Sequence, residues 1–132
     1  MKVLSLKEPF ATLIKDGIKT IETRSWNTKY RGEIYIHASL TRSKSETVPE
    51  AEKLVKTKEN PGFILCKCEL VDCVEMTDEY LAELDKTSND YKCGIYAKGR
   101  YAWKLKLLEV LDNPIPCKGK LGIWNYNDET KK

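Results

Sequence analysis

The chain has 132 residues, of which 41% are apolar, and this length and composition suffice for one domain with a single packed core. No stretch approaches the roughly 18 apolar residues of a membrane-spanning helix, and the opening MKVLSLKEPF lacks the apolar run of a signal peptide. We therefore predict a soluble, cytoplasmic protein. The five cysteines are an odd number in a chain without secretory features, so reduced thiols are expected rather than a disulfide framework.

The net charge of +3 is distributed unevenly along the chain. Residues 1–44 and 94–132 are basic, whereas residues 45–93 contain twice as many acidic as basic residues. If the two basic ends meet in the fold, their surface attracts an anion such as phosphate or nucleic acid, and the acidic middle is a solvated elaboration. Chance clustering on a highly charged surface is the alternative interpretation.

The first part of the chain predicts three short strands and one helix. The helix spans about two turns over residues 8–16, because Pro9 suits a first helical turn and Gly17 suits a left-handed stop. The strands are expected at residues 3–6, 19–26 and 33–38. In the last of these, spelled EIYIHA, the alternation places both isoleucines on one face and His37 on the other.

The remainder of the chain predicts polar helical segments between longer strands. Residues 41–62 and 75–93 are polar elaborations, each with a short helix. Residues 63–74 alternate as a strand, with Ile64, Cys66, Cys68 and Leu70 expected on one face. Further strands are expected over residues 101–111 and near the end of the PIPCKGKLGIWNY segment.

About six strands with short helices between them, and no regular βαβ alternation, favour an α+β fold that is mainly β. We expect a small, mixed, mostly antiparallel sheet, closed or nearly closed into a barrel, with short flanking helices. One domain spans residues 1–126, and residues 127–132 are expected to be a frayed tail.

The stretch GIKTIETRSW, residues 17–26, carries charges of both signs within a predicted strand. A period of two places Glu22, Arg24 and Trp26 on one face. Lys19 has the opposite parity and joins them only if residues 17–19 form an irregular turn. On spacing alone, an exposed row of ion pairs worth at most about 1 kcal/mol is the simpler interpretation.

The order of motifs along the chain resembles the ASCH family, which is related to the PUA-like barrels. The resemblance rests on SLKEPFATLIKDGIKTIETRSW, RGEIYIHAS, RYAWKL and PIPCKGKLGIW. The family pattern G-x-K-x-x-E-x-R is met by Gly17, Lys19, Glu22 and Arg24. The resemblance covers nearly the whole chain apart from its acidic middle and tail. It implies a PUA-like β-barrel with a cleft lined by the motif, and a role in binding RNA or a nucleotide-like or modified-nucleoside ligand.

An enzymatic function is the alternative that this resemblance implies. Some similar small bacterial proteins are amidohydrolases that remove the acyl group from N4-acetylcytidine, and other members are nucleases. In the amidohydrolase pattern the motif lysine, here Lys19, acts with a threonine three residues later. Glu22 occupies that position in this sequence, so the hydroxyl group is missing. If the protein is an enzyme, we expect a hydrolase that uses Lys19 and Glu22, without a cofactor.

The candidate ligand-binding residues have charged, aromatic, imidazole or hydroxyl side chains in the matching segments: Lys19, Glu22, Arg24, Trp26, His37, Ser39 and Lys118. Arg24 offers a planar fork for phosphate or for stacking on a base. Trp26 either stacks on a base or packs under a covering loop. His37, the only histidine, is either a hydrogen-bonded structural residue or a functional group. Lys118 belongs to a basic turn, whose lysines either bind a phosphate or remain exposed to solvent without a ligand.

The cysteines do not have the spacing of a metal site. Cys66 and Cys68 are two residues apart, unlike the C-x₂-C knuckles of structural zinc, and a single histidine is available. We therefore predict no metal. The predicted partner is RNA or a nucleotide-like small molecule, with no membrane contact, and a monomer is favoured. A protein-binding function of the acidic middle is a third interpretation.

Overall fold

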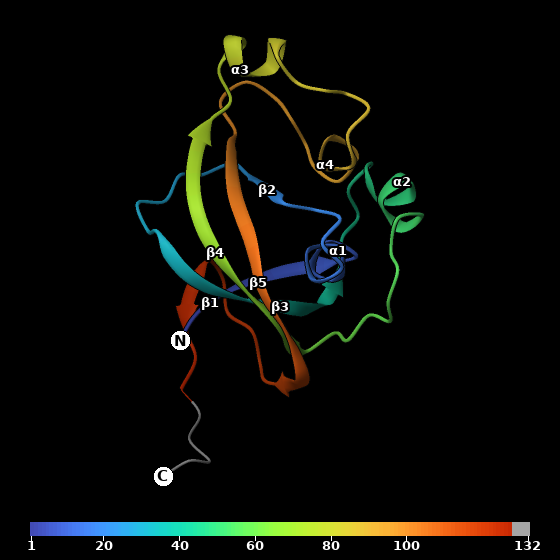
Figure 1. The fold of residues 1–132 in the computed structure, drawn as a ribbon, viewed down its shortest axis with the longest axis vertical. Coiled ribbons are helices and arrows are strands. Elements are labelled where there is room, and N and C mark those ends of the chain that lie inside the picture. The colour runs from blue at the N-terminus through green and yellow to red at the C-terminus, as the bar shows by residue number, and fades with distance from the viewer. Residues whose placement is uncertain (128–132) are drawn as a thin grey trace.

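The computed structural model describes residues 1–127 and shows one six-stranded sheet curled into a half-barrel, with the strand order β2-β5-β4-β3-β1-β6 (Figure 1). Strand β1 (Lys2–Glu8) pairs with β3 (Gly32–Arg42) in parallel, and the four other neighbouring pairs are antiparallel. This arrangement confirms the predicted mixed, mostly antiparallel β fold. Of the frayed tail predicted for residues 127–132, residues 128–132 lie outside the described part of the chain.

Each predicted strand is present in the structure. The remaining strands are β2 (Ile21–Arg24), β4 (Phe63–Glu75), β5 (Tyr101–Pro116) and β6 (Ile123–Asn125). Strand β5 extends five residues beyond its predicted end because β4 pairs with it as far as Pro116. Within the described residues, no helix is long and apolar enough to cross a membrane.

Four short helices connect the strands: α1 (Phe10–Lys15), α2 (Val48–Glu52), α3 (Asp78–Ala82) and α4 (Asn89–Lys92). Helix α4 is a second helix within residues 75–93, where the sequence predicted one. It forms because the Ser88 hydroxyl accepts a hydrogen bond from the backbone N–H of Tyr91, which caps the first turn.

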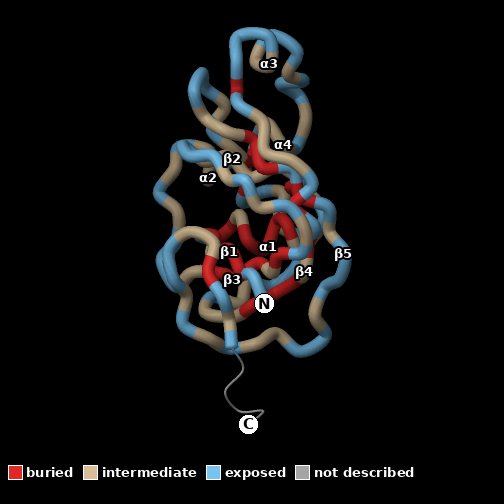
Figure 2. The backbone as a smooth tube through the Cα atoms, turned by 90° about the vertical axis from the view of Figure 1, so that its left-hand side faces the viewer, coloured by how far each residue is buried: buried red, intermediate tan, exposed pale blue. Residues whose placement is uncertain are grey.

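The core lies between the sheet and α1, where the buried segments of the tube converge (Figure 2). The predicted alternation in β3 is confirmed, since Ile34 and Ile36 are fully buried. The prediction for β4 is wrong at its start. Leu65 joins Cys66 and Cys68 in the main core, while Ile64 packs in a second cluster, because the pairing with β5 shifts register between residues 64 and 66.

Helix α1 and the turn that ends it lead the chain into β2, the strand that carries Glu22 and Arg24. The Glu8 carboxylate accepts hydrogen bonds from both the backbone N–H and the hydroxyl of Thr12, which holds the first turn. Gly17 ends the helix with a φ of 76°, and the N–H groups of Ile18 and Lys19 both donate to the carbonyl of Leu13. Strand β2 therefore begins only at Ile21, after the irregular turn that would let Lys19 join its neighbours.

Candidate functional site

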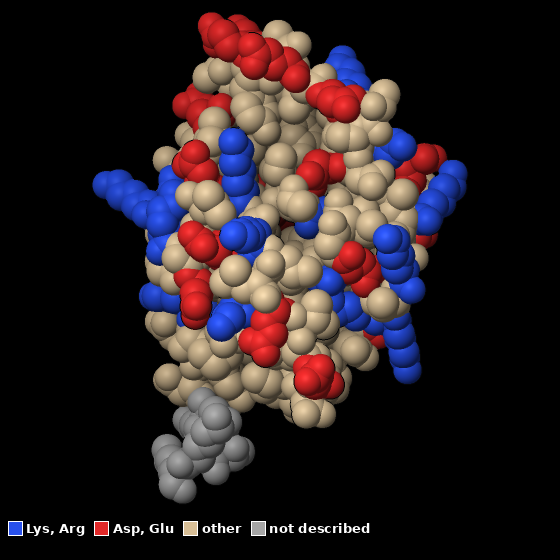
Figure 3. All heavy atoms as spheres, viewed as in Figure 1, with Lys and Arg blue, Asp and Glu red and all other residues tan. Residues whose placement is uncertain are grey.

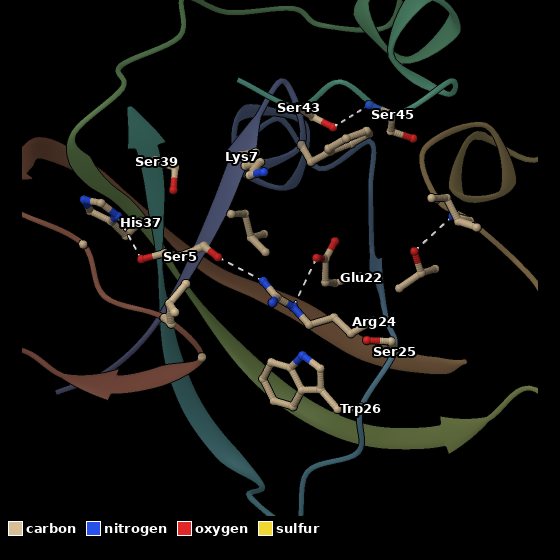
Figure 4. Close-up of a pocket in the computed structure, with 18 of the residues that line it drawn as sticks. Ser5, Lys7, Glu22, Arg24, Ser25, Trp26, His37, Ser39, Ser43 and Ser45 are labelled. Carbon is tan, nitrogen blue, oxygen red and sulfur yellow. Dashed lines mark hydrogen bonds and ion pairs between the residues drawn. The ribbon is translucent and has the colours of Figure 1, made fainter. Parts of the chain in front are cut away.

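A pocket of about 700 Å³ lies between the two ends of the curled sheet (Figure 4). One side comes from β2 and the residues that follow it, and the other comes from β1, β3 and residues 117–122. Six of the seven predicted ligand-binding residues line the pocket: Glu22, Arg24, Trp26, His37, Ser39 and Lys118. Lys19 is not among the lining residues, and only 2% of it is exposed.

Glu22 and Arg24 project from β2 into the pocket side by side, as their shared parity predicts (Figure 4). The Arg24 Nε lies 3.3 Å from Glu22 Oε2, and a terminal nitrogen of Arg24 donates to the carbonyl of Ser5 at 3.0 Å. The guanidinium also lies 5.3 Å from the ring centroid of Trp26 and 5.8 Å from that of Trp103. Arg24 thus connects β2 to β1 across the pocket.

Lys19 lies behind the pocket and not on its surface. Its Nζ donates to the carbonyl of Cys93 at 2.6 Å and lies 3.4 Å from Glu22 Oε1. The ring centroid of Phe10 is 5.3 Å from the same nitrogen. Lys19 is therefore a buried cation held by three residues that themselves line the pocket.

The residues that follow α4, Cys93, Gly94 and Ile95, line the pocket. The sequence did not predict this, because residues 75–93 are interpreted there as a polar elaboration. The Asp90 carboxylate accepts hydrogen bonds from the N–H of Thr20 at 2.6 Å and of Ile21 at 3.0 Å. The N–H of Ile95 donates to the Thr23 hydroxyl at 3.0 Å. A Cβ at Gly94 would lie 2.8 Å from Thr23 Cγ2, so only glycine permits this approach.

His37 is a fully hydrogen-bonded part of the pocket. The carbonyl of Cys117 can only accept, so His37 Nε2 donates to it at 2.9 Å, and Nδ1 accepts from the Ser5 hydroxyl at 3.1 Å. Trp124 Nε1 in turn donates to Ser5 Oγ at 3.0 Å. This network fixes residue 117 and the loop that follows it. Gly119 is essential here, because a Cβ would lie 2.6 Å from the His37 ring.

Basic side chains from distant parts of the chain meet in the pocket. Its lining contains five basic residues, Lys7, Arg24, Arg100, Lys118 and Lys120, and one acidic residue, Glu22. The basic first and last thirds of the chain do therefore meet in the fold. Acidic side chains from the middle gather instead at the end of the molecule occupied by α3 (Figure 3). The pocket is accordingly an electropositive hollow suited to an anion.

Exposed apolar side chains also contribute to the pocket. Of the eight large apolar residues that are exposed in the described part of the chain, four line it: Trp26, Leu40, Ile95 and Leu121. Trp26 is 39% exposed, with its ring edge-to-face against Trp103 at a centroid distance of 4.7 Å. The lining therefore offers contacts to a flat apolar group as well as to an anion.

The two thiols at the pocket are poor nucleophiles. Burial raises the pKa of the Cys93 thiol, partly offset by the nearby Lys19 ammonium, and burial raises the pKa of the Cys117 thiol. Both stay protonated at neutral pH, so neither supplies a thiolate. Among the described residues, no group of three or more histidine, cysteine or acidic side chains is placed to hold a metal ion.

Comparison with known proteins places this architecture in a family. Residues 4–115 match the model of the ASCH domain. Activating signal cointegrator 1 from Mus musculus is 36% identical over 138 residues, and the Homo sapiens protein is 35% identical. Each alignment covers 96% of this chain but 22% of the relative, so the chain spans about a fifth of their length.

Solved structures agree on the fold. The crystal structure of ASCH from Zymomonas mobilis superposes with a TM-score of 0.52 at 20% identity, covering 87% of this chain and 72% of that one. A mutant of the same protein gives a TM-score of 0.51 at 19% identity, covering 87% and 74%. These likenesses, together with a family match over most of the chain, show that the protein belongs to the ASCH domain family.

Proposed function

We propose that the pocket binds RNA or a nucleotide-like ligand, with Glu22 and Arg24 of the G-x-K-x-x-E-x-R motif at its centre. The observation that carries this proposal is the composition of the lining, in which five basic side chains accompany a single carboxylate and an exposed indole. Lys and Arg side chains neutralise the phosphates of nucleic acids, and a base supplies the flat group that stacks on an aromatic ring.

Each part of the ligand has a corresponding part of the pocket. Lys118 and Lys120 are exposed and form no ion pair with any described residue, so their ammonium groups are available to a phosphate. Arg24 offers its planar fork beside Trp26. In this proposal Lys19 is a positioning residue that holds Glu22, and His37 is a positioning residue that holds the loop carrying Lys118.

Lys118→Ala combined with Lys120→Ala is expected to weaken binding of a mixed-sequence RNA hexanucleotide and to reduce the salt dependence of its affinity. Loss of two phosphate contacts lowers the slope of log K against log salt concentration by about 1.4 for a single strand. Isothermal titration calorimetry between roughly 50 and 200 mM salt measures both quantities, a range over which such slopes are resolved. The matched control is Lys104→Ala with Lys106→Ala, which removes two exposed lysines of β5 outside the pocket lining.

The proposal fails if the unmodified protein does not bind the RNA. It also fails if the loop variant and the β5 control variant behave alike, since binding would then reflect overall charge.

We expect no release of cytidine when the protein is incubated with N4-acetylcytidine. Glu22 replaces the threonine of the amidohydrolase pattern, and the Lys19 ammonium is held by the Cys93 carbonyl behind the pocket. Liquid chromatography of the reaction separates the two nucleosides, and electrophoresis of the RNA after binding tests for nuclease activity. Turnover that is abolished in a folded Lys19→Met variant, which keeps most of the side-chain volume, would instead support the hydrolase alternative.

A further inference from the structure

Glu22 is the one carboxylate in an otherwise basic lining, and its surroundings define what it can accept. Its Oε1 lies 3.4 Å from Lys19 Nζ, and its Oε2 lies 3.3 Å from Arg24 Nε. These contacts are ion pairs, and Arg24 Nε makes no hydrogen bond to a described residue, so each carboxylate oxygen keeps at least one of its roughly two acceptor positions. The side chain is 13% exposed and projects from β2 toward β1 across the pocket, where a ligand can reach it (Figure 4).

A carboxylate held between two cations offers acceptors and no donor. It therefore repels a ligand edge that presents carbonyl oxygens and suits one that presents two neighbouring N–H groups, one for each oxygen. Guanine presents such a pair on its Watson–Crick edge, N1–H and the N2 amino group. Adenine and cytosine each present one amino group beside an acceptor nitrogen, and uracil presents one N–H between two carbonyls.

We propose, building on the proposed function, that Glu22 makes this pocket selective for guanine and that the ligand is a guanine nucleotide or a guanine in single-stranded RNA. The basic lining disfavours cationic amidines and guanidines, which also present paired N–H donors, because they would meet five basic side chains. A guanine nucleotide combines the neutral donor pair with an anionic phosphate. Such a ligand can therefore donate two hydrogen bonds to Glu22 while its phosphate contacts Lys118 and Lys120.

The test compares binding of GMP, IMP, AMP, CMP and UMP to the unmodified protein by isothermal titration calorimetry. GMP is expected to bind about 5–150-fold more tightly than AMP, CMP or UMP, because a bidentate base contact discriminates by roughly 1–3 kcal/mol and each 1.4 kcal/mol is tenfold. IMP has N1–H but no N2 amino group, so its affinity is expected to lie between that of GMP and that of UMP. This comparison involves no substitution and is independent of any effect on folding.

Glu22→Gln gives the reciprocal result. A glutamine amide presents one donor and one acceptor, which matches the edge of adenine or cytosine and mismatches guanine. The variant is expected to lose the preference for GMP and to gain affinity for AMP or CMP, whereas the control Lys106→Gln on β5 keeps the preference for GMP. Circular dichroism of the variant verifies the fold.

The possible outcomes separate the two proposals. If neither the nucleotides nor the mixed-sequence hexanucleotide binds, the proposed function fails and this inference fails with it. If they bind with equal affinity, if GMP and IMP bind alike, or if a folded Glu22→Gln variant retains the preference for GMP, guanine selectivity alone is overturned.

Discussion

Lys19→Ala is expected to lower the free energy of unfolding by about 3–5 kcal/mol, the cost of removing one partner from a buried ion pair. The substitution leaves the Cys93 carbonyl without its 2.6 Å hydrogen bond and leaves Glu22 with Arg24 as its remaining cation. It also opens a cavity beside Phe10, because Lys19 is 2% exposed. Urea denaturation at neutral pH measures the change as a shift in the midpoint.

The matched control is Lys106→Ala, which removes an exposed lysine of β5 and should change stability by less than about 0.5 kcal/mol. A second substitution, Lys19→Met, keeps most of the side-chain volume but removes the charge. Because Lys19 does not line the pocket, Lys19→Met should leave the salt dependence of RNA binding unchanged. A slope reduced by about 0.7 would contradict this and would make Lys19 a direct phosphate ligand.

Arg24→Ala is expected to weaken RNA binding by about 10–100-fold, the largest effect of any single substitution in the pocket. A hydrogen bond to a charged group contributes roughly 1.5–3 kcal/mol, and each 1.4 kcal/mol is tenfold in affinity. The substitution removes the central cation, its contact with the Trp26 ring, and the hydrogen bond to the Ser5 carbonyl. Calorimetry with the same hexanucleotide measures the loss.

Arg24→Lys separates charge from geometry. It keeps the positive charge but replaces the planar fork with a single ammonium group, so we expect it to recover only part of the affinity. Full recovery would mean that Arg24 contributes charge alone. Unchanged binding in Arg24→Ala would place the ligand elsewhere on the molecule.

The period of two along β2 was enough to predict that Glu22 and Arg24 are neighbours, because strand parity is a local property of the backbone. A different signal, the left-handed conformation that glycine tolerates, correctly placed the end of α1 at Gly17, whereas the irregular turn that Lys19 needs was stated only as a condition. In β4 the alternation failed at Ile64, where a shift in pairing with β5 moves one side chain to another cluster. Such a shift depends on the partner strand and has no signal in the residues themselves.

The contribution of residues 93–95 to the pocket was missed for a related reason. Asp90 and Thr20 are 70 residues apart in sequence, and no periodicity connects them. Composition was misleading here. The acidic and polar residues of 75–93 are typical of a solvent-exposed segment, yet Asp90 accepts hydrogen bonds from the backbone at the start of β2. The informative signal was Ser88 ahead of Asp90, because a serine at this position caps a helix and so predicts an ordered turn within residues 75–93.

The open ends of the sheet have a consequence for dynamics. Strand β2 at one margin and β1 near the other are not paired with each other, and the Arg24 contact with Ser5 spans the gap between them. A ligand that contacts Glu22 and Lys118 together would add a second connection across the gap between the two edges of the sheet. Occupancy should therefore slow amide hydrogen exchange in β2 and β6 more than in the central pair β4 and β5, whose opening already requires disruption of the core.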